Sequence, residues 1–337
     1  MKIAIMGGAG FIGSHLTHAY LNAGNDVFVI DNLTSGSRQV IDPRARFYQV
    51  DIRDKRIQDI LQCERPDMVS HHATHQHETG TGAHTLADAD VHVRGLINVL
   101  DSCINASVKR FIFASGGNNL YGRVDAEQLP LPEITPLHPR TAQDISKAAG
   151  EWYVRYYSQQ YGLKHTIMRY ADIYGEEEPF QFRHPLSYFI RMLHEQQRPV
   201  IRGTGNEIKD HIFIDDIVQA HLQLLKTLPR GENRTFHISS GLGYSLKQLY
   251  NIAALVQNSQ IEPVYIAGSH LISSAIVLDN TQAHLALTWQ PQTTLAEGVL
   301  QATKRILSHN QKVPQMVTSA PNTPQAILVT ENRLTHA

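Results

Sequence analysis

The sequence predicts an α/β protein: a doubly wound parallel sheet with helices on both faces, followed by a smaller C-terminal α/β region. Three observations predict it. Short apolar runs alternate with amphipathic helical patterns through the first 170 residues, a glycine-rich turn joins the first run to the first helical pattern, and the alternation becomes irregular after Gly175. Strand–helix alternation is typical of parallel sheets, because each crossover places a helix on a face of the sheet.

The first part of the chain supplies six apolar runs of strand length, at residues 3–6, 27–30, 47–50, 68–70, 111–114 and 166–169. After the first run, Ile12, Leu16 and Tyr20 recur at helical spacing until Gly24, which is placed to cap the helix. The longest helical patterns cover residues 91–104 and 146–161. We therefore place a first domain at residues 1–175.

The pattern between residues 176 and 308 predicts a smaller region that packs against the first domain. Short strands are expected at 200–201, 211–214, 236–238 and 264–266, and helices at 183–196, 215–228 and 246–256. The sequence leaves open whether some of these strands and helices return to the first domain. Residues 309–337 are polar and contain proline, which predicts a mobile tail.

Composition excludes several classes of protein. Thirty basic residues stand against thirty-one acidic ones, so we expect neither nucleic acid nor an anionic membrane as a partner. Two cysteines, Cys63 and Cys103, are too few for a disulfide framework, which favours a cytoplasmic location. No apolar stretch reaches the roughly twenty residues of a membrane span, and the first run is too short for a signal peptide.

The glycine-rich turn predicts a dinucleotide site. Gly8, Gly10 and Gly13 have the G-x-G-x-x-G spacing between a strand and a helix, where the backbone must approach a pyrophosphate closely. Asp31 ends the second strand, eighteen residues after Gly13. A carboxylate there accepts hydrogen bonds from a ribose and repels a 2′-phosphate, so NAD is expected rather than NADP. Arg38 follows closely and keeps NADP as the alternative.

With these motifs the chain resembles the extended short-chain dehydrogenase/reductase family, in particular its NAD-dependent nucleotide-sugar epimerases and dehydratases, which have a Rossmann fold. The resemblance runs from residue 1 to about residue 305. The segments that carry it are GGAGFIGS at residues 7–14, DNLTSG at 31–36, Asp51-Ile52, HHAT at 71–74, FASGG at 113–117 with LYG at 120–122, RYADIYG at 169–175, KDHIFIDD at 209–216 and HISSG at 237–241.

The resemblance implies NAD as cofactor, a nucleotide sugar or related polyol-like molecule as substrate, and a substrate cap formed by residues 176–308. It also implies a homodimer formed through the helices at 91–104 and 146–161. The cofactor-binding residues that it implies are Gly7, Gly8, Gly10, Phe11, Ile12, Gly13, Asp31, Asn32, Ser35, Gly36, Asp51, Ile52, His72, Ala73, Thr74, Lys147, Tyr170 and Ile173.

The sequence departs from the family at the reaction centre. The family uses a Tyr-x-x-x-Lys pair, and here Gln143 stands at the tyrosine position four residues before Lys147. An amide has no proton that ionises near neutral pH, so Gln143 cannot be a general base. The family's active-site serine or threonine falls at Gly117, Asn118 or Asn119. Further differences are His92, Asp172 and His237 where asparagine is expected, Lys209 where arginine is expected, and no diphosphate-binding arginine near residues 268–271.

Two functions remain open. The first is an NAD-dependent epimerase or dehydratase (an isomerase or lyase) that works by transient hydride transfer with a non-standard acid/base. Its predicted catalytic residues are Gln143, Lys147, Ser115, Tyr121 and His75, and its candidate bases are His75, His77, Asp144, Tyr121 and Asp172. The second is an inactive NAD-binding regulatory or structural subunit.

The run of histidines at positions 71, 72, 75 and 77 raises the possibility of a zinc or nickel site. No cysteine lies nearby, and no recognised ligand spacing completes a tetrahedral site. We therefore predict no metal and interpret this segment as a loop over the cofactor.

Overall fold

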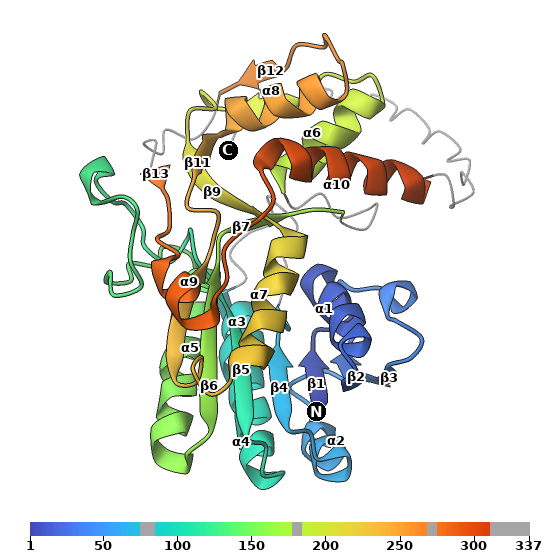
Figure 1. Cartoon of the computed structure of the whole chain (residues 1–337), viewed down its shortest axis with the longest axis vertical. Coiled ribbons are helices and arrows are strands. Elements are labelled where there is room, and N and C mark those ends of the chain that lie inside the picture. The colour runs from blue at the N-terminus through green and yellow to red at the C-terminus, as the bar shows by residue number, and fades with distance from the viewer. Residues whose placement is uncertain (75–84, 177–183, 268–274, 311–337) are drawn as a thin grey trace, which may run out of the picture.

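A computed structural model describes residues 1–74, 85–176, 184–267 and 275–310. Its centre is a seven-stranded sheet, ordered β10-β6-β5-β4-β1-β2-β3, in which every pair is parallel (Figure 1). The strands are β1 (Lys2–Met6), β2 (Asp26–Asp31), β3 (Arg46–Gln49), β4 (Met68–His71), β5 (Arg110–Gly116), β6 (Lys164–Tyr170) and β10 (Arg234–Ile238). The predicted fold class is confirmed.

Along β1, β2, β4, β5 and β6, alternate residues enter two separate cores. Ile3 and Ile5 of β1 face one core, whereas Ala4 and Met6 face the other. Because side chains alternate along a strand, a sheet covered on both faces needs apolar residues at consecutive positions. This requirement explains the continuous apolar runs of the sequence.

Helices cover both faces of this sheet (Figure 1). On one face lie α1 (Phe11–Asn22) and α7 (Ile214–Thr227), which contact each other and contribute side chains such as Leu16 and Leu224 to one core. The other core receives side chains from α2 (Arg56–Glu64), α4 (Leu96–Asn105) and α5 (Ala142–Tyr161). The helix predicted at 91–104 consists of two parts in the structure. A π-helical segment, Asp90–Gly95, follows α3 (Thr85–Ala89) and leads directly into α4.

The smaller part of the molecule lies at the top of Figure 1 and holds α6 (Pro185–His194), α8 (Leu246–Val256) and α10 (Leu295–Asn310). Its strands are β8 (Val200–Arg202), β9 (Ile208–Phe213), β11 (Gly243–Ser245), β12 (Val264–Ile266) and β13 (Ala275–Ile276), and β7 (Asp172–Tyr174) pairs with β9. Two segments of the range 176–308 return to the large sheet: β10 pairs with β6, and α7 covers one face. Both contact α9 (Thr281–Leu287). The described residues also form 3₁₀ turns at Arg38–Val40 and Ala126–Gln128.

Helix starts differ from those predicted, for local reasons. The expected strand at 211–214 ends at Phe213, because Asp215 and Asp216 favour the first turn of a helix. On α5, the Thr141 side chain accepts a hydrogen bond from the Asp144 N–H, so the helix begins four residues earlier than predicted. This start places Gln143 on the helix, one turn before Lys147.

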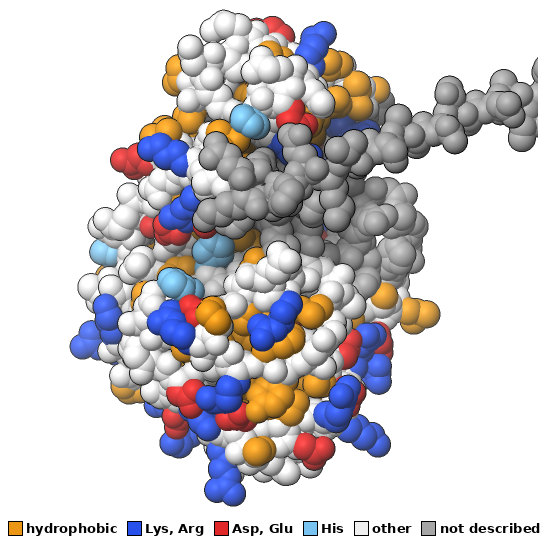
Figure 2. Space-filling model, turned by 90° about the vertical axis from the view of Figure 1, so that its right-hand side faces the viewer, with side chains coloured by type: hydrophobic (Ala, Val, Ile, Leu, Met, Phe, Trp, Pro, Cys, Tyr) orange, Lys and Arg blue, Asp and Glu red, His pale blue; other side chains and the backbone are white. Residues whose placement is uncertain are grey.

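The surface carries both signs of charge. Figure 2 shows basic and acidic side chains interspersed over the described part of one face. Many form short ion pairs, such as Arg46 with Asp26 at 2.9 Å and Arg53 with Asp90 at 2.6 Å. Within the described residues, no helix combines the length and the apolar character needed to span a membrane.

Candidate active site

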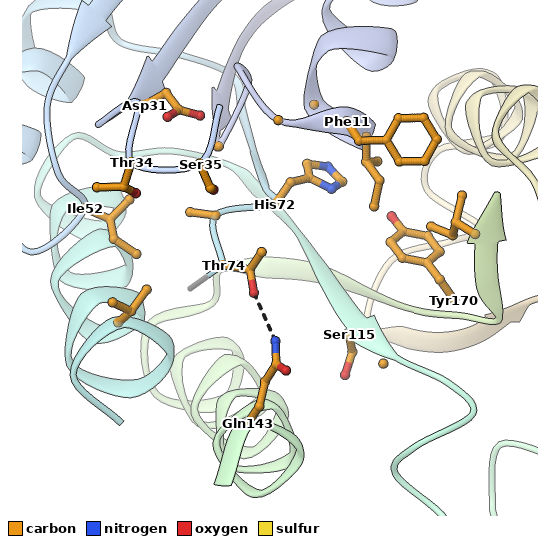
Figure 3. Close-up of a pocket in the computed structure, with 18 of the residues that line it drawn as sticks. Phe11, Asp31, Thr34, Ser35, Ile52, His72, Thr74, Ser115, Gln143 and Tyr170 are labelled. Atoms are coloured by element: carbon orange, nitrogen blue, oxygen red, sulfur yellow. Dashed lines mark hydrogen bonds between the residues drawn. The ribbon is translucent and has the colours of Figure 1, made fainter. Parts of the chain in front are cut away.

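A cleft of about 420 Å³ opens where the strands of the large sheet end (Figure 3). The structure brings most of the predicted cofactor residues together there: Gly7, Gly10, Phe11, Ile12, Gly13, Asp31, Asn32, Ser35, Asp51, Ile52, His72, Ala73, Thr74, Tyr170 and Ile173. The cleft is also lined by Ile30, Thr34, Val50, Val91, Gly116, Gly117, Asn118, Asn119, Ala171 and Asp172, which the predicted set does not contain.

The glycine-rich turn forms a cradle that side chains would fill. Gly7 has a φ of +78°, and a Cβ there would lie 2.6 Å from the Ala73 amide nitrogen. A Cβ on Gly13 would lie 2.2 Å from the carbonyl oxygen of Gly7. No side chain of the described residues caps the start of α1, so its first N–H groups and its dipole are available to an anion. This part of the cleft therefore fits a dinucleotide pyrophosphate.

Two predicted cofactor glycines support the cradle from outside the cleft. A Cβ on Gly8 would lie 2.6 Å from the Val29 side chain, and one on Gly36 would lie 2.6 Å from the Ala9 carbonyl oxygen. Neither glycine lines the cleft. Their role in this structure is the close packing of the turn against β2 and the loop after it.

The two carboxylates at the Asp31 end of the cleft are held by hydrogen bonds. Asp31 accepts from the N–H groups of Ala9, at 3.0 Å, and Leu33, at 2.8 Å. Asp51 accepts from the Asn32 amide at 2.7 Å, and hydrogen bonds from Arg53 lower its pKa well below the usual range.

Arg38, the residue that kept NADP as an alternative, lies elsewhere. Its guanidinium stacks 4.5 Å from the centroid of the Phe47 ring, and it does not line the cleft. Of these two residues, only Asp31 lines the cleft, at the end where the sequence predicts the cofactor ribose.

Gln143 and Ser115 line the opposite end of the cleft from Asp31 (Figure 3). The Gln143 amide nitrogen lies 3.5 Å from the Thr74 hydroxyl oxygen. The Ser115 hydroxyl donates to the Glu151 carboxylate at 2.7 Å, and Glu151 is fully buried in an ion pair with Arg169. Because its single proton is used in this bond, Ser115 presents lone pairs and acts as a hydrogen-bond acceptor towards the cleft.

Lys147 lies behind the cleft rather than in its lining. Its ammonium donates to the carbonyl oxygen of Ala114 at 3.1 Å and lies 5.3 Å from the centroid of the Phe113 ring. Burial lowers the pKa of Lys147 to about 8. The lysine is thus held one turn from Gln143, against the strand that carries Ser115.

Tyr121, one of the predicted catalytic residues, is fully buried and does not line the cleft. Its hydroxyl accepts from Arg169 at 2.7 Å and also contacts the imidazole of His237. Burial raises the pKa of Tyr121 to about 12. This placement argues against the catalytic role predicted for Tyr121, because the residue has no path to a substrate and holds its proton.

His75 and His77 lie outside the described residues, so the predicted role of His75 has no structural counterpart here. The described residues contain no group of three or more metal-binding side chains. Several of their histidines act as buried hydrogen-bonding groups. His221, for example, lies 2.8 Å from the Tyr20 hydroxyl and 2.7 Å from that of Tyr170.

Asp172 and Lys209 form an ion pair at 3.3 Å beside the same end of the cleft as Gln143. They come from neighbouring strands, since Asp172 begins β7 and Lys209 lies on β9. The sequence analysis gives Asp172 only as one of several candidate bases and assigns no catalytic role to Lys209. The signal for it was present, because both positions differ from the family in residue type.

Comparison with known proteins gives the family. A model described as the NAD dependent epimerase/dehydratase family matches residues 3–239. A putative UDP-glucose 4-epimerase of Methanocaldococcus jannaschii is 31% identical over 310 residues, which cover 92% of this chain and 99% of that protein. The UDP-glucose 4-epimerase of Lacticaseibacillus casei is 29% identical, with 86% of this chain and 92% of that protein covered.

Two solved structures agree with this result. The UDP-glucose 4-epimerase of Thermotoga maritima with UDP-glucose superimposes with a TM-score of 0.87 at 31% identity, covering 93% of this chain and 100% of the other. The Thermus thermophilus UDP-glucose 4-epimerase in complex with NAD gives 0.83 at 27% identity, covering 91% and 99%. The chain therefore belongs to the NAD-dependent epimerase/dehydratase family, and its cofactor is NAD.

Proposed function

We propose that this protein is an NAD-dependent epimerase that inverts a hydroxyl-bearing carbon of a UDP-linked hexose. One observation carries the proposal: a single cleft joins the dinucleotide cradle to a polar end that contains Ser115, Gln143 and Asp172. The relatives that match nearly the whole chain are UDP-glucose 4-epimerases, and they support the same substrate class.

Bound NAD supplies an acceptor, and later a donor, for the hydride of the sugar carbon. The chain must hold the sugar against the cofactor and take the proton of the hydroxyl that is oxidised. Gln143 can donate and accept hydrogen bonds but cannot take that proton. The proposal therefore includes a non-standard acid/base, with Gln143 and Ser115 positioning the sugar.

The alternative of an inactive NAD-binding subunit is not favoured. Its basis was the loss of the tyrosine and the altered residues around it. The relatives are named as enzymes, and this chain aligns with almost their whole length. In addition, a protein without turnover would not need the carboxylate, hydroxyl and amide groups that line the end of the cleft opposite Asp31. Epimerisation is preferred to dehydration because those relatives are epimerases.

We propose in addition that the protein is a homodimer formed through α5. Ile145, Trp152 and Tyr156 recur at helical spacing on this helix, and their exposed fractions are 54%, 69% and 49%. A stripe of large apolar side chains on one helix face is a feature of protein–protein interfaces.

A cytoplasmic location stays a prediction. It agrees with the free thiols of Cys63 and Cys103, because the cytoplasm keeps thiols reduced.

The test is turnover of UDP-glucose and UDP-galactose by purified protein with NAD, with the products identified by proton NMR. We expect interconversion of the two sugars. Gly13→Ala should abolish NAD binding and turnover, because its Cβ would lie 2.2 Å from the Gly7 carbonyl oxygen. Gly24→Ala meets no atom within 4 Å, so it should keep NAD binding and turnover, while the φ of +80° at this position lowers its stability by about 1–2 kcal/mol. A protein that binds NAD and converts no UDP-hexose would overturn the proposal.

A further inference from the structure

The described residues that line the cleft include five with ionisable side chains: Asp31, Asp51, His72, Tyr170 and Asp172. The first two lie at the ribose end, where backbone N–H groups occupy both of them. Asp31 and Asp51 therefore stabilise the loops around the proposed ribose site and are not candidates for proton transfer. Figure 3 shows Asp31 at the opposite side of the cleft from Ser115 and Tyr170.

His72 and Tyr170 lie closer to the reacting end but face the protein interior. The imidazole of His72 lies 2.8 Å from the Ser70 hydroxyl, and burial lowers its pKa far below the ordinary value. The Tyr170 hydroxyl lies 2.7 Å from His221, and burial raises its pKa well above 10. His72 is a very weak base, and Tyr170 keeps its proton, so neither suits proton exchange near neutral pH.

Asp172 differs from these four groups. It lies two residues after Tyr170, its side chain is 25% exposed, and its carboxylate pairs with the Lys209 ammonium at 3.3 Å. His211 lies opposite it on β9, and His184 and Asn118 also face it. Burial alone would raise the pKa of Asp172, but its polar and charged surroundings, chiefly the Lys209 ammonium, outweigh burial and lower it. Asp172 is therefore an ionised carboxylate with access to the cleft.

The two histidines beside Asp172 are fixed as neutral groups. The Leu186 N–H donates to Nδ1 of His184 at 3.1 Å, so the His184 proton lies on Nε2 and is donated to Nδ1 of His211 at 2.9 Å. Burial lowers the pKa of His184 to about 3 and of His211 to about 4. Lys209 is thus the charged partner that sets the charge state of Asp172.

We propose that Asp172, paired with Lys209, is the catalytic residue that takes and returns the hydroxyl proton of the sugar. This assignment rests on the proposed function. In the forward half-reaction the O–H bond breaks and its proton goes to the Asp172 carboxylate, while the C–H bond breaks and its hydride goes to NAD. The carbon becomes a ketone. In the reverse half-reaction the hydride returns to the other face of that carbon, and Asp172 returns the proton to the oxygen.

Lys209 acts as a positioning residue in this scheme. Its positive charge keeps Asp172 ionised, and its own pKa is raised, chiefly by Asp172. Asp144, the residue after Gln143, also contributes to the raised pKa of Lys209, so the ammonium lies near the start of α5 as well. The Asp172–Lys209 pair therefore lies at the end of the cleft that Gln143 lines.

The experiment measures the absorbance at 340 nm as protein loaded with NAD meets UDP-glucose or UDP-galactose, together with steady-state epimerisation. Asp172→Asn keeps the shape of the side chain and removes its basicity. We expect both rates to fall about 100-fold or more, within the range for loss of a general base. NAD and UDP-hexose affinities, measured by calorimetry, should stay within about threefold. Asp215→Asn is the matched control, because Asp215 pairs with Arg305 at 2.7 Å outside the cleft.

Lys209→Met tests the electrostatic role of Lys209 through the pH–rate profile, which a purely structural role would not change. Without the ammonium the pKa of Asp172 rises, so the acid limb of the pH–rate profile should move to higher pH while UDP-hexose affinity changes little. An acid limb at the wild-type position would overturn the assignment, as would a loss smaller than tenfold in Asp172→Asn, or a full loss in Asp144→Asn with an active Asp172→Asn. A wild-type protein that turns over no UDP-hexose would overturn the proposed function and this assignment together.

Discussion

Gln143, which the sequence analysis aligns with the family's tyrosine, reaches the cleft from the first turn of α5. Gln143→Tyr introduces a bulkier phenol that cannot replace the amide's paired donor and acceptor. We expect the epimerase rate to fall by about 5- to 150-fold, which corresponds to about 1–3 kcal/mol for a lost hydrogen-bond partner. NAD affinity should be unchanged.

The matched control for Gln143→Tyr is Gln159→Tyr, because Gln159 is exposed on the same helix. It should keep wild-type turnover. If Gln143→Tyr also kept full activity, the Gln143 side chain would have no part in the reaction. A rise in activity would mean that the family's phenol, once restored beside Lys147, is the better base.

At the residue scale, Asp31 is the side chain that we expect to select NAD over NADP. We expect NAD to bind more tightly than NADP, and Asp31→Asn should narrow the ratio of the two dissociation constants about tenfold, or about 1.4 kcal/mol. The reason is that a neutral amide no longer repels a 2′-phosphate. Calorimetric titration measures both constants.

Arg38→Met provides the comparison for Asp31→Asn. Because Arg38 stacks on Phe47, its loss should leave the ratio unchanged. A lower NADP affinity in Arg38→Met would show that this arginine swings to the phosphate. Equal affinities of the wild-type protein for NAD and NADP would contradict the role given to Asp31.

At the scale of elements, α5 has two faces with different roles. One face carries Gln143 into the cleft and packs Val154 into the core, and the other exposes Ile145, Trp152 and Tyr156. Trp152→Glu places a charge in the middle of this apolar stripe, so it should convert the proposed dimer to a monomer at micromolar concentration. Sedimentation velocity measures the change.

Leu255→Glu on α8 is the control for the dimer prediction. Leu255 is 80% exposed and lies in the smaller part of the molecule. The variant should sediment as the wild type does. A wild-type monomer, or a Trp152→Glu protein that still dimerises, would refute an interface at α5.

At the scale of the whole molecule, the described residues include seven buried histidines whose pKa is lowered by burial. Burial lowers the pKa of each, to between about 3 and about 4 for His71, His165, His184, His211, His221 and His237, and far below 6.5 for His72. Each group is neutral in the folded protein and titrates near 6.5 once unfolded. Their contribution to stability is therefore complete above pH 6.5 and is lost as the pH falls below it.

We expect the free energy of unfolding to fall steeply between pH 6.5 and 5.5, by up to about 1.4 kcal/mol per histidine per pH unit. Urea titrations across this range measure the slope. His71→Leu removes one such group, which stacks between Phe111 and Phe113, and should reduce the slope by about one proton. A flat profile in the wild type would refute the account.

The sequence alone determined six strands of the large sheet, the glycine cradle and the position of Asp31 at the end of β2, because each depends on local rules. Six strands were visible as apolar runs, since a strand buried on both faces needs apolar residues at consecutive positions. Gly8 and Gly13 were visible because only glycine permits the close contacts seen at these positions. Asp31 was visible because its distance along the chain from the turn is set by one helix and one strand.

The tertiary structure decided the relations between distant segments. The pattern at 236–238 has no local property that separates an edge strand of the large sheet from a strand of the cap, and only its pairing with β6 places it. Tyr121 was a plausible catalytic side chain in sequence, yet the loop after β5 turns it towards Arg169 and His237. The Asp172–Lys209 pair exists because β7 and β9 pair in one register. Local patterns report burial and backbone conformation, whereas the meeting of side chains from separate elements depends on how those elements pack.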